Sequence, residues 1–162
     1  MKKRSRLGPL PGGADKYVNG LQKCLEFVRE SNPSEEQLKG WFLKTFALKS
    51  ERTVRDYMYT IKNLGLIVKD GKKLLLSDTA KKFLETQENK LLYQVLDANY
   101  VGFNETLRIL YGNAFTLRDF APLLRQKTRT KWQKETQCAL RLYWLSSLGY
   151  VVKKGRKYTL NK

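Results

Sequence analysis

An internal repeat constrains this sequence more than any other feature. Tyr59–Ser77 aligns without gaps onto Tyr143–Asn161, an offset of 84 positions. Eight of the nineteen aligned pairs are identical, and several of the rest are conservative, such as Lys72 against Arg156. Two segments that follow one pattern independently indicate a single structural unit used twice. We therefore expect two similar units in tandem.

The repeat reads as the end of a helix followed by a β-hairpin. In the helix that leads into the first copy, Val54, Met58 and Ile61 are three or four residues apart, which places them on one face. Gly65 stands where a helix C-terminus needs a residue tolerant of positive φ. Asp70-Gly71 is a strong signal for a hairpin turn. We expect a helix, a reversal and two short strands with a basic tip.

The residues before the first copy predict two more helices. Residues 15–29 carry an apolar face, and Asn32-Pro33 ends that helix. Ser34 to Gln37 has the pattern of a capping box, which opens a second helix, and Ser50 caps the third. The first unit therefore spans residues 14–77. Residues 1–13 form a basic arm whose glycines and prolines favour neither a helix nor a strand.

The residues between and after the repeat copies predict further helices. Asp78 is expected to cap one helix, and residues 90–97 and 103–110 to form others, so that 78–112 is a helical connector. The second unit spans 113–162, with Thr116 as the cap of a helix over 117–124. Its third helix, 135–148, is apolar around much of its circumference, which predicts burial on two sides.

The charge balance indicates a polyanionic partner. The 162 residues include 32 Lys and Arg against 15 Asp and Glu, a net charge of +17. No apolar run reaches the ~18 residues of a membrane span, and the basic start lacks the apolar core of a secretory signal. We therefore expect a cytoplasmic, nucleoid-associated protein that does not contact membranes.

The chain has no histidine, which excludes His-based acid–base chemistry and every Cys/His zinc finger. Cys24 and Cys138 lie among apolar neighbours and are interpreted as core thiols. Asp78 with Glu88 and Lys90 imitates the acidic motif of metal-dependent nucleases, but that motif needs a twisted hairpin and these residues lie in helical stretches. We expect no catalytic residue, no metal and no cofactor.

The pattern Tyr-x4-Leu-Gly-Leu/Tyr-Ile/Val-Val, which is followed by the hairpin in both copies, resembles the helix-to-wing segment of winged-helix DNA-binding domains. The resemblance implies a mainly α (α+β) protein of two tandem winged helix-turn-helix units joined by connector helices, each with a short β-hairpin wing. The tandem arrangement is also similar to the target-recognition part of modular (FokI-like) type II restriction endonucleases. It implies sequence-specific binding of double-stranded DNA, with any nuclease on a separate domain or subunit.

In a winged helix the exposed half of the third helix faces base edges in the major groove, and the wing contacts the backbone. Two such heads on one chain make a monomer sufficient. The candidate DNA-binding residues are those that should be polar and exposed on the arm, the third helices, the loop before the second of these helices, and the two wings: Lys2, Lys3, Arg4, Arg6, Ser50, Arg52, Thr53, Arg55, Tyr59, Lys69, Lys72, Lys73, Lys127, Arg129, Lys131, Trp132, Gln133, Lys134, Thr136, Gln137, Arg141, Lys153, Lys154, Arg156 and Lys157.

Three other functions remain open from the sequence. A transcriptional regulator would have the same fold and a different consequence of binding. An RNA-binding or protein-interaction module would use the apolar third helix of the second unit. A nuclease would cleave DNA when Mg²⁺ is added.

Overall fold

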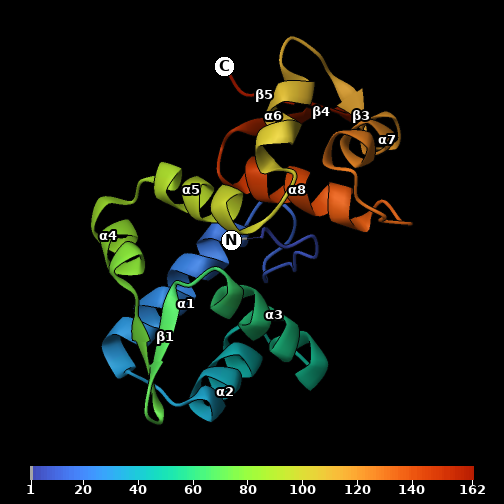
Figure 1. Cartoon of the computed structure of the whole chain (residues 1–162). Helices are drawn as coiled ribbons and strands as arrows, with labels where there is room; N and C mark the ends of the chain where they lie inside the picture. Colours follow the sequence, from blue (N-terminus) through green and yellow to red (C-terminus); the bar gives the residue numbers. More distant parts are fainter. Residues whose placement is uncertain (1) are drawn as a thin grey trace. The chain divides into compact units, whose positions relative to one another are not determined.

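The computed structural model describes residues 2–162 as a mainly helical chain with small antiparallel sheets (Figure 1). The chain divides into two compact units. Residues 8–91 form the first, called here the N-terminal unit. Residues 92–162, together with the short segment that ends at Leu7, form the second, called the C-terminal unit.

The N-terminal unit follows the order helix, helix, helix, hairpin, helix. Its elements are α1 (Tyr17–Ser31), α2 (Glu35–Thr45), α3 (Glu51–Asn63), β1 (Ile67–Asp70), β2 (Lys73–Leu76) and α4 (Asp78–Thr86), and α5 (Asn89–Asn99) contains the boundary with the next unit. The strands pair in an antiparallel hairpin, and α1 packs against β2 and α4. The core includes the apolar face of α1, where Leu21, Cys24 and Val28 are fully buried.

Side-chain caps set most of the helix starts in this unit. The predicted capping box is confirmed, because the Ser34 hydroxyl accepts from the Gln37 amide at 3.2 Å and the Gln37 side chain accepts from the Ser34 amide at 2.9 Å. Ser50 caps α3 as expected. The expectation that Asp78 caps α4 is wrong, because the Ser77 hydroxyl, one residue earlier, accepts from the Ala80 amide at 3.2 Å. Asp78 instead lies in the first turn, where its charge complements the helix dipole.

The C-terminal unit has a three-stranded antiparallel sheet and three helices of its own. Its elements are α6 (Phe103–Leu110), β3 (Phe115–Thr116), α7 (Leu117–Thr128), α8 (Thr136–Ser147), β4 (Val151–Lys154) and β5 (Lys157–Leu160), with the strands in the order β3-β5-β4. α8 packs against α6, α7 and β4, and residues 138–142, 144 and 145 are buried. The prediction of a third helix enclosed on more than one side is confirmed.

The sequence repeat is also a repeat of backbone geometry. Both hairpins have the same register, with Ile67 opposite Leu76 in one and Val151 opposite Leu160 in the other. Three loop hydrogen bonds recur at the offset of 84: Leu64 N to Thr60 O with Leu148 N to Trp144 O, Gly65 N to Lys62 O with Gly149 N to Ser146 O, and Ser77 N to Leu66 O with Asn161 N to Tyr150 O. The reversal needs glycine in both copies, because φ there is +70° and +87°.

The two units differ at the strand before their second helix. In the C-terminal unit Phe115, just before the cap of α7, pairs with Tyr158. In the N-terminal unit Pro33, just before the cap of α2, only accepts a hydrogen bond from the Leu74 amide at 2.7 Å. Leu74 and Tyr158 are equivalent in the repeat. Proline has no amide hydrogen to donate, so this strand is reduced to a single bond.

The expected connector is divided between the units. α4 packs on α1 and β2 of the N-terminal unit, whereas α6 packs on α7, α8 and β5 of the C-terminal unit. The helices of residues 78–112 therefore complete the two cores. Helices α5 and α6 occur where the sequence predicts them, and α1 begins at Tyr17, two residues later than expected.

Cys24 and Cys138 are buried free thiols, and burial raises the pKa of both. Desolvation disfavours the thiolate, so neither sulfur is poised for nucleophilic or redox chemistry. Over residues 2–162, no helix combines the length and the apolar character needed to cross a bilayer.

Candidate nucleic-acid interface

The outer face of α3 presents polar side chains above an apolar inner face. Val54 and Met58 are buried, whereas Arg52, Arg55 and Tyr59 are exposed, the tyrosine to 67%. Within residues 2–162 these three side chains have no hydrogen bond or ion pair to the protein. They are therefore available to an external partner. Thr53 is half-buried, and the Ser50 hydroxyl is occupied as the helix cap.

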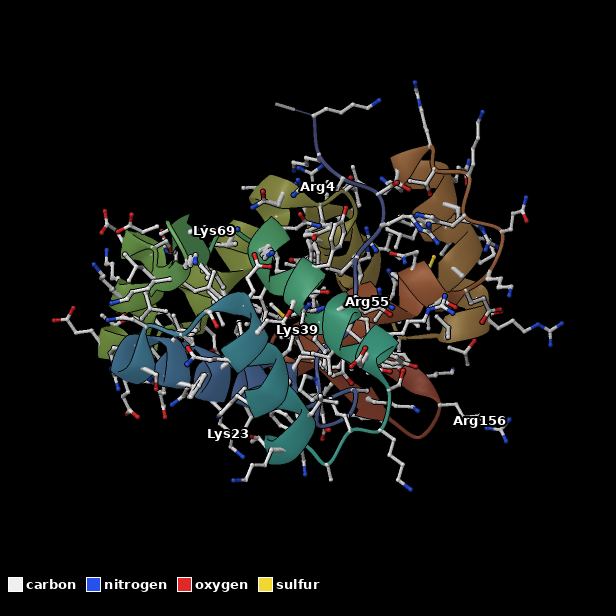
Figure 2. The ribbon with its side chains drawn as sticks, turned by 90° about the horizontal axis from the view of Figure 1, so that it is seen from below. Arg4, Lys23, Lys39, Arg55, Lys69 and Arg156 are labelled. Atoms are coloured by element: carbon white, nitrogen blue, oxygen red, sulfur yellow. The ribbon has the colours of Figure 1, made fainter. Side chains whose placement is uncertain are left out.

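A groove of about 310 Å³ lies between α2 and α3. Arg55 lines it from α3 and Lys39 from α2, and Figure 2 shows both side chains on these neighbouring helices. Lys39 is not among the predicted residues, because its place beside α3 follows from helix packing. Its ammonium lies 3.2 Å from Glu36, so its charge is partly compensated.

The hairpin tips carry the other predicted cations of the repeat. Lys72 and Lys73 are exposed at the first tip, and within residues 2–162 their ammonium groups make no hydrogen bond or ion pair. Lys69 is less free, because its ammonium lies 3.9 Å from Glu35. The Lys62 ammonium, 2.6 Å from the same carboxylate, is the main cause of the lowered pKa of Glu35.

The tip of the second hairpin is also basic. Its cations are exposed: Lys153, Lys154, Arg156 and Lys157. The Lys153 ammonium lies 5.5 Å from the centre of the Tyr158 ring, whereas Arg156 extends away from its ribbon at the turn (Figure 2). The two tips share a position in the repeat and a positive charge, which is the arrangement expected of phosphate contacts.

The basic arm is held by the protein itself. Residues 2–7 belong to the C-terminal unit, where the Arg4 amide donates to Asn99 O at 2.7 Å and the Val101 amide donates to Arg4 O at 3.0 Å. Leu7 is buried, and Gln137 binds its backbone twice, accepting from the amide at 2.8 Å and donating to the carbonyl at 3.1 Å. The arm is therefore ordered by contacts within the C-terminal unit, and the expectation of a free Gln137 side chain is wrong.

Arg141 is the centre of this attachment. It is predicted to face nucleic acid, but its side chain is fully buried, so that prediction is wrong. Its guanidinium donates to Val101 O at 3.0 Å, Ser5 O at 2.8 Å, and Gln137 O and Oε1 at 3.2 and 2.6 Å. All four acceptors are neutral oxygens. Burial lowers the pKa of Arg141 to about 10, so the side chain still carries its charge at neutral pH.

Trp132 closes the attachment from outside. Its indole nitrogen donates to Ser5 O at 3.1 Å, and the Arg141 guanidinium carbon lies 4.5 Å from the centre of its ring. This distance is in the range of a cation–π contact. Trp132 thus lies between the buried cation and the surface.

A groove of about 890 Å³ runs along the arm and the α7–α8 loop. None of its described lining residues is acidic, and six are basic: Lys2, Lys3, Arg6, Arg129, Lys131 and Lys134. Lys3 is partly compensated by Asp97, 3.7 Å away. Trp132, Gln133, Thr136 and Gln137 also line it, so the structure brings together most of the residues that the sequence predicts for the arm and the loop.

The lining of this groove differs from the sequence-based prediction in two ways. Lys127 is expected in the loop but lies in the last turn of α7, and it does not line the groove. Ser5, Thr128 and Thr130 line the groove without having been predicted. Each of them is a hydroxyl residue next to basic residues in the sequence. That pattern could have identified them, since hydroxyl side chains commonly contact phosphate.

The backbone conformation of Gly102 leads to a prediction about stability. It precedes α6 with φ of +104°, and a Cβ there would lie 3.1 Å from Arg141 Nε. We expect Gly102→Ala to lower the free energy of unfolding by roughly 1–3 kcal/mol, through backbone strain and crowding of the guanidinium. Urea denaturation checks this. The matched control is Gly40→Ala in α2, where a Cβ meets nothing within 4 Å and should stabilise the helix by up to about 1 kcal/mol. Equal effects of the two changes would contradict the prediction.

The nuclease-like residues are not assembled into a site. Asp78 begins α4 and Lys90 lies in α5, so no shared hairpin brings them together. Among residues 2–162, no group of three Cys, Asp or Glu side chains is placed to hold a metal ion. Comparison of the chain with protein-family models gives no match, and comparison with curated proteins gives none either.

Proposed function

We propose that this protein binds double-stranded DNA sequence-specifically through two winged-helix units. The observation that carries the proposal is a basic hairpin that follows a third helix in both units with the same register and three matching loop hydrogen bonds, in a chain of net charge +17. In the N-terminal unit it stands beside a helix face of unpartnered Arg52, Arg55 and Tyr59.

The order of elements supports the winged-helix assignment. In each unit a helix, a bridging segment, two helices and an antiparallel hairpin follow one another. The bridging segment is β3 in the C-terminal unit and the single Pro33 bond in the N-terminal unit. In this assignment α3 and α8 are the recognition helices and the hairpins are the wings.

The two units would contact different parts of the duplex. Arginine is suited to bidentate contact with guanine, so the exposed face of α3 would read base edges in the major groove. α8 is buried on most sides, so the C-terminal unit would contact the backbone with its wing. Base reading would therefore come mainly from the N-terminal unit, and positioning from both.

For the biological role, we propose target recognition in a restriction–modification type enzyme, with a nuclease on a separate domain or subunit. The tandem arrangement and its resemblance to modular restriction endonucleases support this role. A monomer would suffice, because one chain supplies both heads. A transcriptional regulator would bind a duplex in the same way, and it would be distinguished by a target site located in promoters.

Selection from a random duplex library tests the proposal, and two variants sharpen it. We expect Arg55→Ala to relax preference at one base pair, worth about 1–3 kcal/mol of discrimination. Lys72→Ala should weaken all duplexes alike and reduce the slope of log affinity against log salt by about one. Lys23→Ala on α1 removes the same charge elsewhere and is the control; Lys23 is exposed (Figure 2).

Several outcomes would contradict this proposal. The library could yield no enriched sequence, or Arg55→Ala and Lys72→Ala could have the same effect on every sequence. Tighter binding to structured RNA than to any duplex would instead support an RNA-binding module.

A further inference from the structure

We propose that the groove along the arm and the α7–α8 loop binds a short stretch of unpaired DNA, with one base stacked on Trp132 and its flanking phosphates held by the surrounding cations. This site is separate from the α3 face and the wings. It adds a second ligand to the proposed duplex binding, and either function can fail alone.

Trp132 is anchored as a stacking platform. Its hydrogen bond to Ser5 O and the Arg141 guanidinium fix the plane of the indole. The guanidinium occupies one face of the ring, so a base can stack only on the opposite face. The side chain is half-buried and lines the groove, and it is the only aromatic residue among the described lining residues. A pre-ordered ring loses little entropy when a ligand stacks on it.

Stacking on an aromatic ring favours an unpaired strand over a duplex. Bases inside a duplex already stack on their neighbours and offer only their edges in the grooves, whereas unpaired bases present a free face. Such stacking is worth about 1–3 kcal/mol per base. The groove volume of about 890 Å³ lies in the range of small-ligand sites, which suits a few nucleotides.

The charges around Trp132 suit a phosphodiester chain. Five of these cations are exposed, and within residues 2–162 their charged groups make no hydrogen bond or ion pair: Lys2, Arg6, Arg129, Lys131 and Lys134. Because no described lining residue is acidic, nothing in the groove repels a phosphate. A positive channel with an aromatic platform is the arrangement that single-strand binders use.

The start of α8 adds to the positive field of the groove. Thr128 and Thr130 also line the groove, but the Thr128 hydroxyl donates to Leu124 O at 2.8 Å and its oxygen lies 3.0 Å from the Thr130 hydroxyl, so these hydroxyls bond within the chain. Thr136 lines it at the first turn of α8, whose N-cap position, Glu135, supplies no side-chain cap. The positive end of the helix dipole therefore adds to the field of the cations. Glu135 is exposed and does not itself line the groove.

The test measures binding of a fluorescein-labelled octathymidine to the full chain. We expect Trp132→Ala to weaken binding about 5- to 150-fold, the fold-change that corresponds to one stacked base. Trp132→Phe keeps an aromatic face and should stay within a few-fold of the unmodified protein. Tyr111→Ala is the matched control: Tyr111 is a 78% exposed aromatic of the same unit that does not line the groove, so its loss should change nothing.

A second readout separates stacking from loosening of the arm. An octamer with 2-aminopurine at its centre should lose fluorescence on binding when its base stacks on Trp132, and Trp132→Ala should remove that quenching. Replacing Arg129 and Lys131 together by alanine should lower the slope of log affinity against log salt by about 1.4, since each single-strand phosphate contact contributes about 0.7. The quenching should remain in this double variant.

Four results would overturn the proposal. The unmodified chain could fail to bind the octamer, or Trp132→Ala could bind it equally well. Trp132→Ala could weaken a fully paired duplex as much as the octamer, which would make the groove part of the duplex surface. An RNA octamer bound at least tenfold more tightly would make RNA the ligand. Arg55→Ala leaves the groove intact, so a loss of duplex selectivity confined to that variant would support duplex reading whatever the octamer shows.

Discussion

Replacing Arg141 by alanine is expected to lower the free energy of unfolding of the C-terminal unit by about 3–5 kcal/mol. The side chain makes four hydrogen bonds, and a bond from a charged donor is worth about 1.5–3 kcal/mol. Its removal also opens a cavity beneath Trp132 and leaves Val101 O and Ser5 O without this donor. Chemical denaturation followed by near-ultraviolet circular dichroism measures the loss.

The same change should release the basic arm. In the unmodified protein the amides of Leu7 and Val101 are hydrogen-bonded and should exchange slowly with solvent hydrogen. In Arg141→Ala both should exchange at nearly the rate of an unfolded chain, while amides of the N-terminal hairpin stay protected. Hydrogen exchange resolved by residue separates this local release from global unfolding.

Two further variants identify what Arg141 contributes. Arg141→Lys keeps the charge but lacks the planar fork that reaches several acceptors at once, so we expect it to retain most of the defect. Gln137→Ala removes both bonds to Leu7 and should lower stability by only about 1–3 kcal/mol. Wild-type exchange at Leu7 in Arg141→Lys would show that charge alone holds the arm, contrary to this account.

Raising monovalent salt from 50 to 200 mM is expected to lower duplex affinity about 10³- to 10⁵-fold. This range corresponds to six to ten phosphate contacts, each of which releases counterions on binding. The exposed cations of the two hairpins and of α3 are numerous enough to supply them. Fluorescence anisotropy titrations of a labelled duplex at several salt concentrations measure the slope.

Removing known cations should change that slope by counted steps. Replacing Lys72 and Lys73 together by alanine should reduce it by about two, because each phosphate contact contributes about 0.9. The same double change at Lys81 and Lys82 of α4, which are exposed and lie outside both wings, is the control and should leave the slope unchanged. An affinity that hardly responds to salt would contradict phosphate-based binding altogether.

The sequence by itself determined the local structure of this protein, which is its helices, turns and hairpins. The two helix-and-hairpin copies, their register and most helix boundaries follow from residues close together in the chain, such as Ser34 with Gln37 or the glycines of the two reversals. These features depend on backbone conformation and on caps within one turn of a helix, so their signals are short-range and recur at fixed spacing.

Only the tertiary structure decided where the arm and the Arg141 side chain pack. A basic segment rich in glycine and proline carries no signal of what it will pack against, and an arginine on a helix looks the same in sequence whether it faces solvent or a buried carbonyl. Ser5 and Arg141 are 136 positions apart, and their hydrogen bond exists because the C-terminal unit folds Val101, Gln137 and the arm around one guanidinium. Contacts of that separation arise from packing, which no local pattern encodes.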